Sequence, residues 1–457
     1  MWKRRLTTLW RQVTIPPQTT DERNVYFLYA EIVFASILSA AGSFNAAYVL
    51  RLGGSNAMIG LMSSLPALLA MVCYIPSAGF LERRTRYMPW LVGSLLISRT
   101  GYLLIPLLAF FLQGALPQVT VAILISMTIP SVFFSTAWSP LLSDVVPVRS
   151  RATVLSWRSI LSSATIAPLI FLVGRWLDLI PFPANYQWMY IVSFLGGAFS
   201  VYLVSRIRPP EKSASAISRP KRVPWRDMLG ISLLRENRTF LRIVTNTLLF
   251  NLGTWMVGPL YIILFVRQLG ASDGWIGMNG TLANVGVIVG YWAWRRIIRK
   301  TGENKAMLIA LPLGCVYPFL VAAVPNLTFI LLAGFLINLI HPGVNLSHSM
   351  IFLNLLPEGK KLTSTAVYST VMNVGAFIAP LVGVAVSEAI GITPTLVMGG
   401  VMSLVGASLF YLFPVAPALP RYPQCGASSG SPPVAPPSAL PLALLPAEHS
   451  VTPYEKE

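Results

Sequence analysis

The sequence RIRPPEKSASAISRPKRVPWRDMLGISLLRENR, residues 206–238, is the one long polar stretch between two sets of apolar segments. It contains nine Lys or Arg residues. On each side, about 180 residues divide into six mostly apolar runs, each near the ~20 residues that a membrane-spanning helix needs. The stretch is therefore predicted to be a basic cytoplasmic linker between two membrane-embedded halves.

The composition excludes an ordinary soluble enzyme. The chain is 54% hydrophobic and only 11% charged, whereas roughly a quarter of the residues of a soluble domain are charged. The net charge of +18 does not indicate nucleic-acid binding, because the basic residues lie in short loops between apolar runs, where they orient membrane helices. The three cysteines show no disulfide or metal-ligand spacing, so we expect no cofactor and no metal site.

The apolar runs predict an all-α polytopic membrane protein in which twelve transmembrane helices form two six-helix pseudo-repeat bundles. The predicted spans are residues 25–49, 57–81, 88–112, 119–143, 152–176, 187–206, 239–266, 274–298, 304–323, 327–353, 362–390 and 393–413. The predicted regions are a basic cytoplasmic N-terminal segment (1–24), the first bundle (25–206), the linker (207–238), the second bundle (239–413) and a Pro-rich disordered cytoplasmic tail (414–457).

The distribution of Lys and Arg predicts the orientation of the chain. With a cytoplasmic N-terminus, the inside segments hold 5, 3, 2, 9, 5, 2 and 2 basic residues, 28 in all. Outside loops hold three and the spans hold three, which accounts for all 34. Since cytoplasmic loops are enriched in Lys and Arg, both termini are predicted to be cytoplasmic, in a protein of the cell membrane.

The two halves resemble each other in sequence. LGGSNAMIGL at 52–61 aligns without a gap with LGASDGWIGM at 269–278, at an offset of 217. DVVP at 144–147 aligns with NLLP at 354–357, at an offset of 210. Parallel six-span repeats are a transporter architecture in which the substrate binds between the repeats near the midplane.

These features resemble the major facilitator superfamily of secondary transporters. The resemblance covers about residues 25–413 and includes a signature after the second span, Gly-x-Leu-Ala-Asp-Arg-x-Gly-Arg-Arg. Here that signature corresponds to AGFLERRTRY at 78–87, in which Thr85 replaces the second Gly. The resemblance implies alternating access of the two bundles, with spans one, four, seven and ten nearest the central cavity. On that basis Arg99, in span three, is expected to be structural.

The signature loop and the end of span four suggest a cytoplasmic gate. Acidic and basic side chains there can pair across helix ends and separate when the cavity opens inward. The gate candidates are Glu82, Arg83, Arg86, Asp144 and Arg158. The alternative is that these charges only set the topology.

Ionisable residues within the spans are the candidates for proton coupling, because they are costly in a membrane and usually face the protein interior or water. Glu31 is the only carboxylate well inside a span expected to line the cavity. It is predicted to carry a proton, with His341 and His348 as further candidates. The alternative is a structural ion pair, with Arg158 as its partner at similar depth.

Span ten carries a polar stripe. Asn338, His341, Asn345 and His348 recur at helical spacing on one face, around Pro342-Gly343. We expect this face to line a binding cavity, although interhelical hydrogen bonding explains the same pattern. The predicted substrate-binding and cavity residues are Asn45, Asn251, Trp255, Asn284, Asn338, His341, Asn345, Tyr368 and Asn373.

The predicted function is secondary active transport of a small molecule by alternating access, with coupling to protons. The expected partners are this substrate and the lipid bilayer, and the protein is expected to act as a monomer without nucleic acid. No phosphate-binding loop, His-Glu-x-x-His or Gly-x-Ser-x-Gly motif is present, so an ATPase or hydrolase is not indicated. The alternative is a membrane sensor or scaffold that retains the transporter fold without transporting.

Overall fold

The computed structural model describes residues 19–82, 84, 86–109, 111, 114–209, 237–355 and 361–414. The chain divides into two units, residues 1–417 and 418–457, and all described residues belong to the first. Most of the predicted N-terminal segment and linker, and nearly all of the Pro-rich tail, therefore lie outside the described residues.

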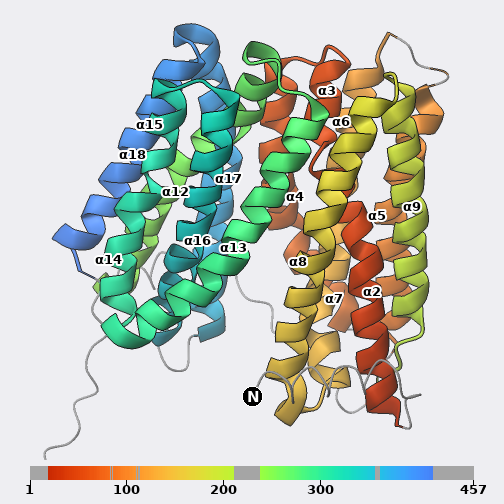
Figure 1. Ribbon diagram of the computed structural model, residues 1–457. Coiled ribbons are helices and arrows are strands. Elements are labelled where there is room, and N and C mark those ends of the chain that lie inside the picture. Colours follow the sequence, from red (N-terminus) through yellow and green to blue (C-terminus); the bar gives the residue numbers. More distant parts are fainter. Residues whose placement is uncertain are drawn as a thin grey trace, which may run out of the picture. The chain divides into compact units, whose positions relative to one another are not determined.

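The first bundle contains the six predicted N-terminal spans (Figure 1). Its helices are α2 (Thr20–Gly42), α3 (Asn45–Arg51), α4 (Asn56–Glu82), α5 (Met88–Ala109), α6 (Leu116–Ser126), α7 (Thr128–Val145), α8 (Val148–Leu179) and α9 (Ala184–Ser205). α2 packs against α8 and α9, and α5 packs against α7 and α9. At the start of α2, Thr19 and Glu22 form a capping box that satisfies free amide groups of the first turn.

The second bundle contains the remaining spans. Its elements are α12 (Arg238–Ile263), the π-helical turn η2 (Leu264–Gln268), α13 (Asp273–Thr301), α14 (Glu303–Gly314), α15 (Val316–Ala323), α16 (Leu327–Leu355), α17 (Lys361–Ile390) and α18 (Ile392–Leu412). Eleven segments of the described chain are long and apolar enough to cross a membrane. The 29-residue helix α13, which ends in a basic turn, is the remaining predicted span. The predicted fold class is thus confirmed.

Three predicted single spans are divided into two helices, and the first of them divides between α2 and α3. The fourth divides into α6 and α7 at Met127, and the ninth into α14 and α15 at Cys315. In the fourth and the ninth, a proline, Pro130 or Pro318, lies three residues beyond the break. Proline has no N–H and its ring crowds the preceding turn, so the regular helix stops just before it.

The ends of the bundles define two sides of the structure. We call the side where α2 begins and α18 ends the terminal side, and the opposite side the distal side (Figure 1). Among the described residues of the terminal side, the buried apolar clusters are made by one bundle each, for example around Leu141 in the first and Phe240 in the second. On the distal side the clusters combine both bundles, as where Leu50 and Ile59 pack with Leu260 and Leu396. Apolar packing thus joins the bundles on the distal side.

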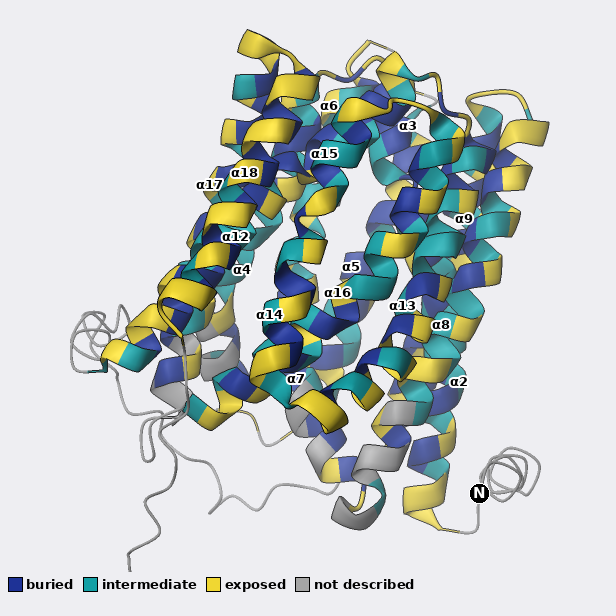
Figure 2. Ribbon diagram, turned by 60° about the vertical axis from the view of Figure 1, so that its left-hand side comes forward, coloured by how far each residue is buried: buried dark blue, intermediate teal, exposed yellow. Residues whose placement is uncertain are grey.

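Exposed and buried residues alternate along the helices, as expected for membrane helices packed on one face (Figure 2). Several large apolar side chains lie on exposed faces, among them Leu172, Leu195 and Trp292. In a soluble protein such surfaces would promote aggregation, but in a bilayer they contact lipid tails.

Candidate functional site

The two bundles are joined on the distal side by a reciprocal latch made of Arg51, Asn56, Arg267 and Asp273. From the first bundle, Arg51 Nε donates to Asp273 Oδ1 at 3.0 Å and Nη2 donates to the Ala271 carbonyl at 3.2 Å. From the second bundle, Arg267 Nη1 donates to Asn56 Oδ1 at 2.7 Å, and its Nη2 donates to the Gly54 carbonyl. Each arginine therefore holds one side chain and one carbonyl of the opposite bundle.

The latch has an internal symmetry that follows from the sequence repeat. Asn56 and Asp273 are separated by the offset of 217 that aligns the two halves, and so are Gly54 and Ala271. The repeat is evident in the sequence, but Arg51, Arg267 and Asp273 are not among the residues predicted to be functional. In the sequence, an arginine lies within two positions before each copy of the repeat, and this pattern could have indicated a functional role. Which residue each arginine contacts depends on how the two bundles pack.

Asp273 is the buried centre of the latch. Its side chain is 5% exposed, whereas that of Arg51 is 29% exposed. The Tyr186 hydroxyl also donates to Asp273 Oδ1, at 2.6 Å. Beside it, Ser272 of the second bundle donates to Asp178 of the first at 3.0 Å. Burial and several donors make this carboxylate a strong electrostatic anchor.

Close helix crossings complete the distal contact. A Cβ on Gly174 of α8 would lie 2.7 Å from the Asp273 carbonyl oxygen and 2.9 Å from Gly277 Cα of α13. One turn further, Thr281 donates to the Ala167 carbonyl across the same interface at 2.9 Å. α4 and α17 form a second extensive crossing between the bundles. The helices approach closely because glycine leaves no side chain between them.

Inside the first bundle, Glu31 and Arg158 form a buried ion pair. Arg158 Nη2 lies 2.6 Å from Glu31 Oε2, and Ser200 donates to Glu31 Oε1 at 3.1 Å. Glu31 is 2% exposed. The guanidinium of Arg158 also stacks on Trp138, with 4.2 Å between Cζ and the ring centre. The pairing that the sequence analysis gave as the alternative for Glu31 is therefore present, while its role as a proton carrier stays a prediction.

Arg99 lies next to this pair. It is 5% exposed, packs on Gly197 of α9, and its Nε and Nη1 atoms have no hydrogen-bond partner among the described residues. Arg99 interacts electrostatically with the Glu31 carboxylate without forming a hydrogen bond to it in the described structure. One carboxylate thus interacts with two arginines.

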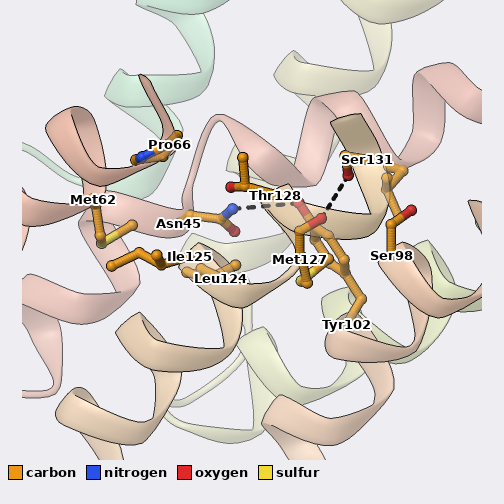
Figure 3. A pocket seen from close by; sticks show the side chains of 11 residues that line it. Asn45, Met62, Pro66, Ser98, Tyr102, Leu124, Ile125, Met127, Thr128 and Ser131 are labelled. Atoms are coloured by element: carbon orange, nitrogen blue, oxygen red, sulfur yellow. Dashed lines mark hydrogen bonds between the residues drawn. The ribbon is translucent and has the colours of Figure 1, made fainter. Parts of the chain in front are cut away.

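A cavity of about 330 Å³ lies beside Asn45 within the first bundle (Figure 3). Asn45 donates to the Tyr102 hydroxyl at 3.3 Å and accepts from the Tyr190 hydroxyl at 3.1 Å. Ser98, Ser131 and Thr128 contribute hydroxyl groups to the same cavity. The predicted cavity residue Asn45 therefore lines a pocket, held in place by two tyrosines.

The predicted stripe on α16 makes interactions of two kinds. His348 Nε2 lies 3.0 Å from the Thr247 hydroxyl, and its ring packs near Tyr368 with 5.9 Å between ring centres. His341 Nδ1 lies 3.1 Å from Asn345 Nδ2, and both side chains are exposed. Asn338 donates to its own helix at Gly334. Of these groups, the His341–Asn345 pair is accessible.

The remaining predicted cavity residues are dispersed over three helices. Asn251 Nδ2 lies 3.8 Å from Met372 Sδ, and Asn284 donates to the Gly280 carbonyl of its own helix at 2.8 Å. The Trp255 ring packs against Gly375 of α17, so closely that a Cβ added to Gly375 would lie 3.1 Å from the ring. Asn373 is half-buried on α17. Their roles in substrate binding stay predictions.

The predicted cytoplasmic gate is described only in part. Arg83 and the side chain of Glu82 lie outside the described residues, and Arg86 is exposed. Asp144 accepts a hydrogen bond from the Tyr87 hydroxyl at 3.1 Å. Burial, assisted by the Asp144 carboxylate, raises the pKa of Tyr87, so the donor keeps its proton at neutral pH. Arg158, proposed as another partner of Asp144, pairs with Glu31 instead.

Comparison with known proteins identifies the family. The model of the Major Facilitator Superfamily matches residues 30–352 and 243–443. The chain belongs to the major facilitator superfamily. No curated protein matches it.

Solved structures of the superfamily share the fold at low identity. A bacterial homologue of the human lysosomal transporter Spinster, inward-facing and unoccupied, has a TM-score of 0.61 and 13% identity, over 87% of this chain and 97% of that one. A bacterial homologue of the iron transporter ferroportin, inward-facing, has a TM-score of 0.67 and 11% identity, over 85% and 98%. The human organic anion transporter MFSD10 has a TM-score of 0.58 and 14% identity, over 86% and 100%. These likenesses establish the fold of a superfamily transporter.

Proposed function

We propose that this protein is a secondary active transporter that moves a small molecule across the membrane by alternating access of its two bundles. The observation that carries the proposal is the reciprocal latch: apolar packing and charged hydrogen bonds join the bundles on the distal side, whereas the terminal-side clusters belong to one bundle each. A contact built from polar side chains at one end can break and re-form, since its groups can be hydrated when the bundles separate.

The orientation completes this proposal. With both termini cytoplasmic, the distal side faces outward and the structure corresponds to a state closed to the outside. The proposed transporter acts as a monomer in the cell membrane. Glu31 is proposed to carry the coupling proton, because it is the buried carboxylate of the first bundle and its partner Arg158 borders a cavity.

The test measures both sides of the protein at once. Spin-label pairs are placed at Leu179 and Val324 on the distal side, and at Leu155 and Lys300 toward the terminal side, all of which are exposed. Distances are recorded by pulsed electron paramagnetic resonance in purified protein and in Asp273→Asn, which weakens the latch. We expect the distal distance to lengthen and the terminal distance to shorten in the same variant.

A scaffold or sensor without alternating access gives a different result. In such a protein, Asp273→Asn can lengthen the distal distance while the terminal distance stays unchanged. A metabolite screen by melting temperature then supplies candidate substrates, and uptake of a stabilising compound into proteoliposomes separates transport from sensing. Independent movement of the two sides, with no uptake of any stabilising compound, would contradict the proposal.

A further inference from the structure

A second cavity, of about 300 Å³, lies beside the buried ion pair. Its lining consists of Arg158, Ser159, Ser162 and Ser163 of α8 together with Ile32 of α2. We call it the serine–arginine pocket. The three serines fall on one face of α8 because Ser162 and Ser163 follow Ser159 by three and four positions. Ser159 is exposed, so the pocket is open to its surroundings.

The hydroxyl groups of this pocket are unusual within the protein. Serines elsewhere in the helices mostly donate to a carbonyl of their own helix, as Ser36 does to Ile32 and Ser77 to Cys73. Among the described residues, the hydroxyls of Ser159, Ser162 and Ser163 have no hydrogen-bond partner, although the same bonds are open to them in α8. They are therefore available as donors to a molecule in the pocket.

The charges around the pocket do not balance. Arg158 lines the pocket and pairs with Glu31, and Arg99, which does not line the pocket, also interacts with the charge of Glu31, so one carboxylate serves two guanidinium groups. Arg158 uses Nη2 for Glu31, while its buried Nε has no partner among the described residues. Arg99 is more than nine-tenths buried, and two of its nitrogen atoms have no partner in the described structure. An uncompensated cation within a membrane is unfavourable, and an anion beside it would remove the imbalance.

We propose that the serine–arginine pocket binds an anionic group of the transported molecule, a carboxylate or a phosphate. This inference rests on the proposed transport function and assigns a substrate class to it. A guanidinium offers planar paired donors that match such groups, and the hydroxyls supply further donors around them. A cationic substrate would be repelled, and a neutral one would leave the excess charge uncompensated.

The deciding experiment measures the preference of the pocket for anions without requiring transport. Ser159→Cys is introduced into full-length protein lacking its native cysteines. The reaction rates of this thiol with sulfonatoethyl and trimethylammonioethyl methanethiosulfonate are measured in detergent, and their ratio is compared with that for free 2-mercaptoethanol. The reagents share one reactive group and differ in charge. We expect the protein to favour the anionic reagent by about tenfold over the reference ratio, as a nearby cation would produce.

Substitution of Arg158 shows whether this preference comes from the pocket. Arg158→Gln should return the ratio to that of the free thiol, whereas Arg158→Lys should retain part of the preference. If Arg158→Gln does not fold, the double variant with Glu31→Gln is compared with Glu31→Gln alone, and the ratio should again fall. A preference for the cationic reagent, or an anionic preference unaffected by these changes, would overturn the proposal.

Competition distinguishes a transported anion from a lipid headgroup. Benzoate and inorganic phosphate are tested for slowing neutral maleimide labelling of Ser159→Cys, with benzamide as the uncharged control. We expect protection by benzoate or phosphate and none by benzamide. Protection by phosphatidylglycerol alone would assign the pocket to lipid and overturn it as a substrate site. Both sets of measurements are independent of the spin-label distances, so failure of this inference is distinguishable from failure of alternating access.

Discussion

Asn56 and Asp273 occupy equivalent positions in the two sequence repeats, and each accepts a hydrogen bond from an arginine of the opposite bundle. The two positions differ in charge, because only one of them is a carboxylate. The latch is therefore symmetric in geometry and asymmetric in strength. Because of this difference, one substitution at each position should change the population of the distal-closed state in opposite directions.

The first prediction uses this asymmetry. Asp273→Asn removes the charge that Arg51 binds and should shift the population away from the distal-closed state by about tenfold, equivalent to about 1.4 kcal/mol, close to the lower end of the range for hydrogen bonds to charged groups. Asn56→Asp places a carboxylate beside Arg267, which is exposed, so it should favour closure by at most about 1 kcal/mol. The Leu179–Val324 spin-label distance reports both. Shifts of the same sign would contradict the latch.

The second prediction concerns the crossing of α8 and α13. Gly174→Ala introduces a Cβ that would lie 2.7 Å from the Asp273 carbonyl oxygen, so the bundles must separate locally. We expect a lengthened distal distance while the latch residues remain intact. The matched control is Gly258→Ala in α12, where a Cβ meets no atom within 4 Å. The control should leave the distance unchanged and raise helix stability by about 0.5–1 kcal/mol. An unchanged distal distance in Gly174→Ala would show that the crossing is not tight.

The third prediction separates two roles of Glu31. Glu31→Gln leaves Arg158 without its carboxylate, and breaking a buried pair costs about 3–5 kcal/mol. A purely structural Glu31 therefore predicts a large fall in melting temperature, partly restored by adding Arg158→Gln. If Glu31 also carries the proton, the folded Glu31→Gln single variant, which keeps Arg158, should still exchange substrate but lose proton-driven accumulation. Full accumulation in a folded Glu31→Gln protein would rule out the carrier role and leave His341 and His348.

The fourth prediction concerns Asp144. Tyr87 donates to it in this state, and since burial raises the pKa of Tyr87 above its ordinary value near 10, the donor keeps its proton at neutral pH. If Asp144 closes the terminal side by pairing with a signature-loop arginine, Tyr87→Phe should release it and favour closure. Asp144→Asn should favour opening. Each shift should be about twofold to fivefold, as for one hydrogen bond. The Leu155–Lys300 spin-label distance measures both shifts. If neither substitution changes this distance, Asp144 is not part of the gate.

The fifth prediction is the topology. Single cysteines introduced between residues 207 and 236 should resist membrane-impermeant thiol reagents in intact cells, because that stretch is predicted to be cytoplasmic. Ser55→Cys, in an exposed loop on the distal side, should be labelled under the same conditions. The reverse pattern would invert the orientation of the chain and the assignment of the distal side to the exterior.

The sequence by itself determined the fold and the position of nearly every span. Runs of apolar residues long enough for a bilayer leave the backbone no alternative to helix, since each amide must be satisfied within its own segment. For this reason the predicted span at 88–112 matches α5, and the repeat of LGGSN with LGASD anticipates two related bundles. Charged residues such as Glu31 also stood out, because few groups of that kind occur in membrane segments.

The partners of the charged residues were decided only by the tertiary structure. Arg158 lies at a depth from which either Glu31 or Asp144 could have been its partner, and only the packing of α2 against α8 selected Glu31. Arg51 and Asp273 are 222 positions apart, and no local pattern relates them. Periodicity along a chain specifies which face of a helix is polar, but which groups meet depends on how helices from distant segments pack, because a hydrogen bond requires its two atoms to lie within about 3 Å.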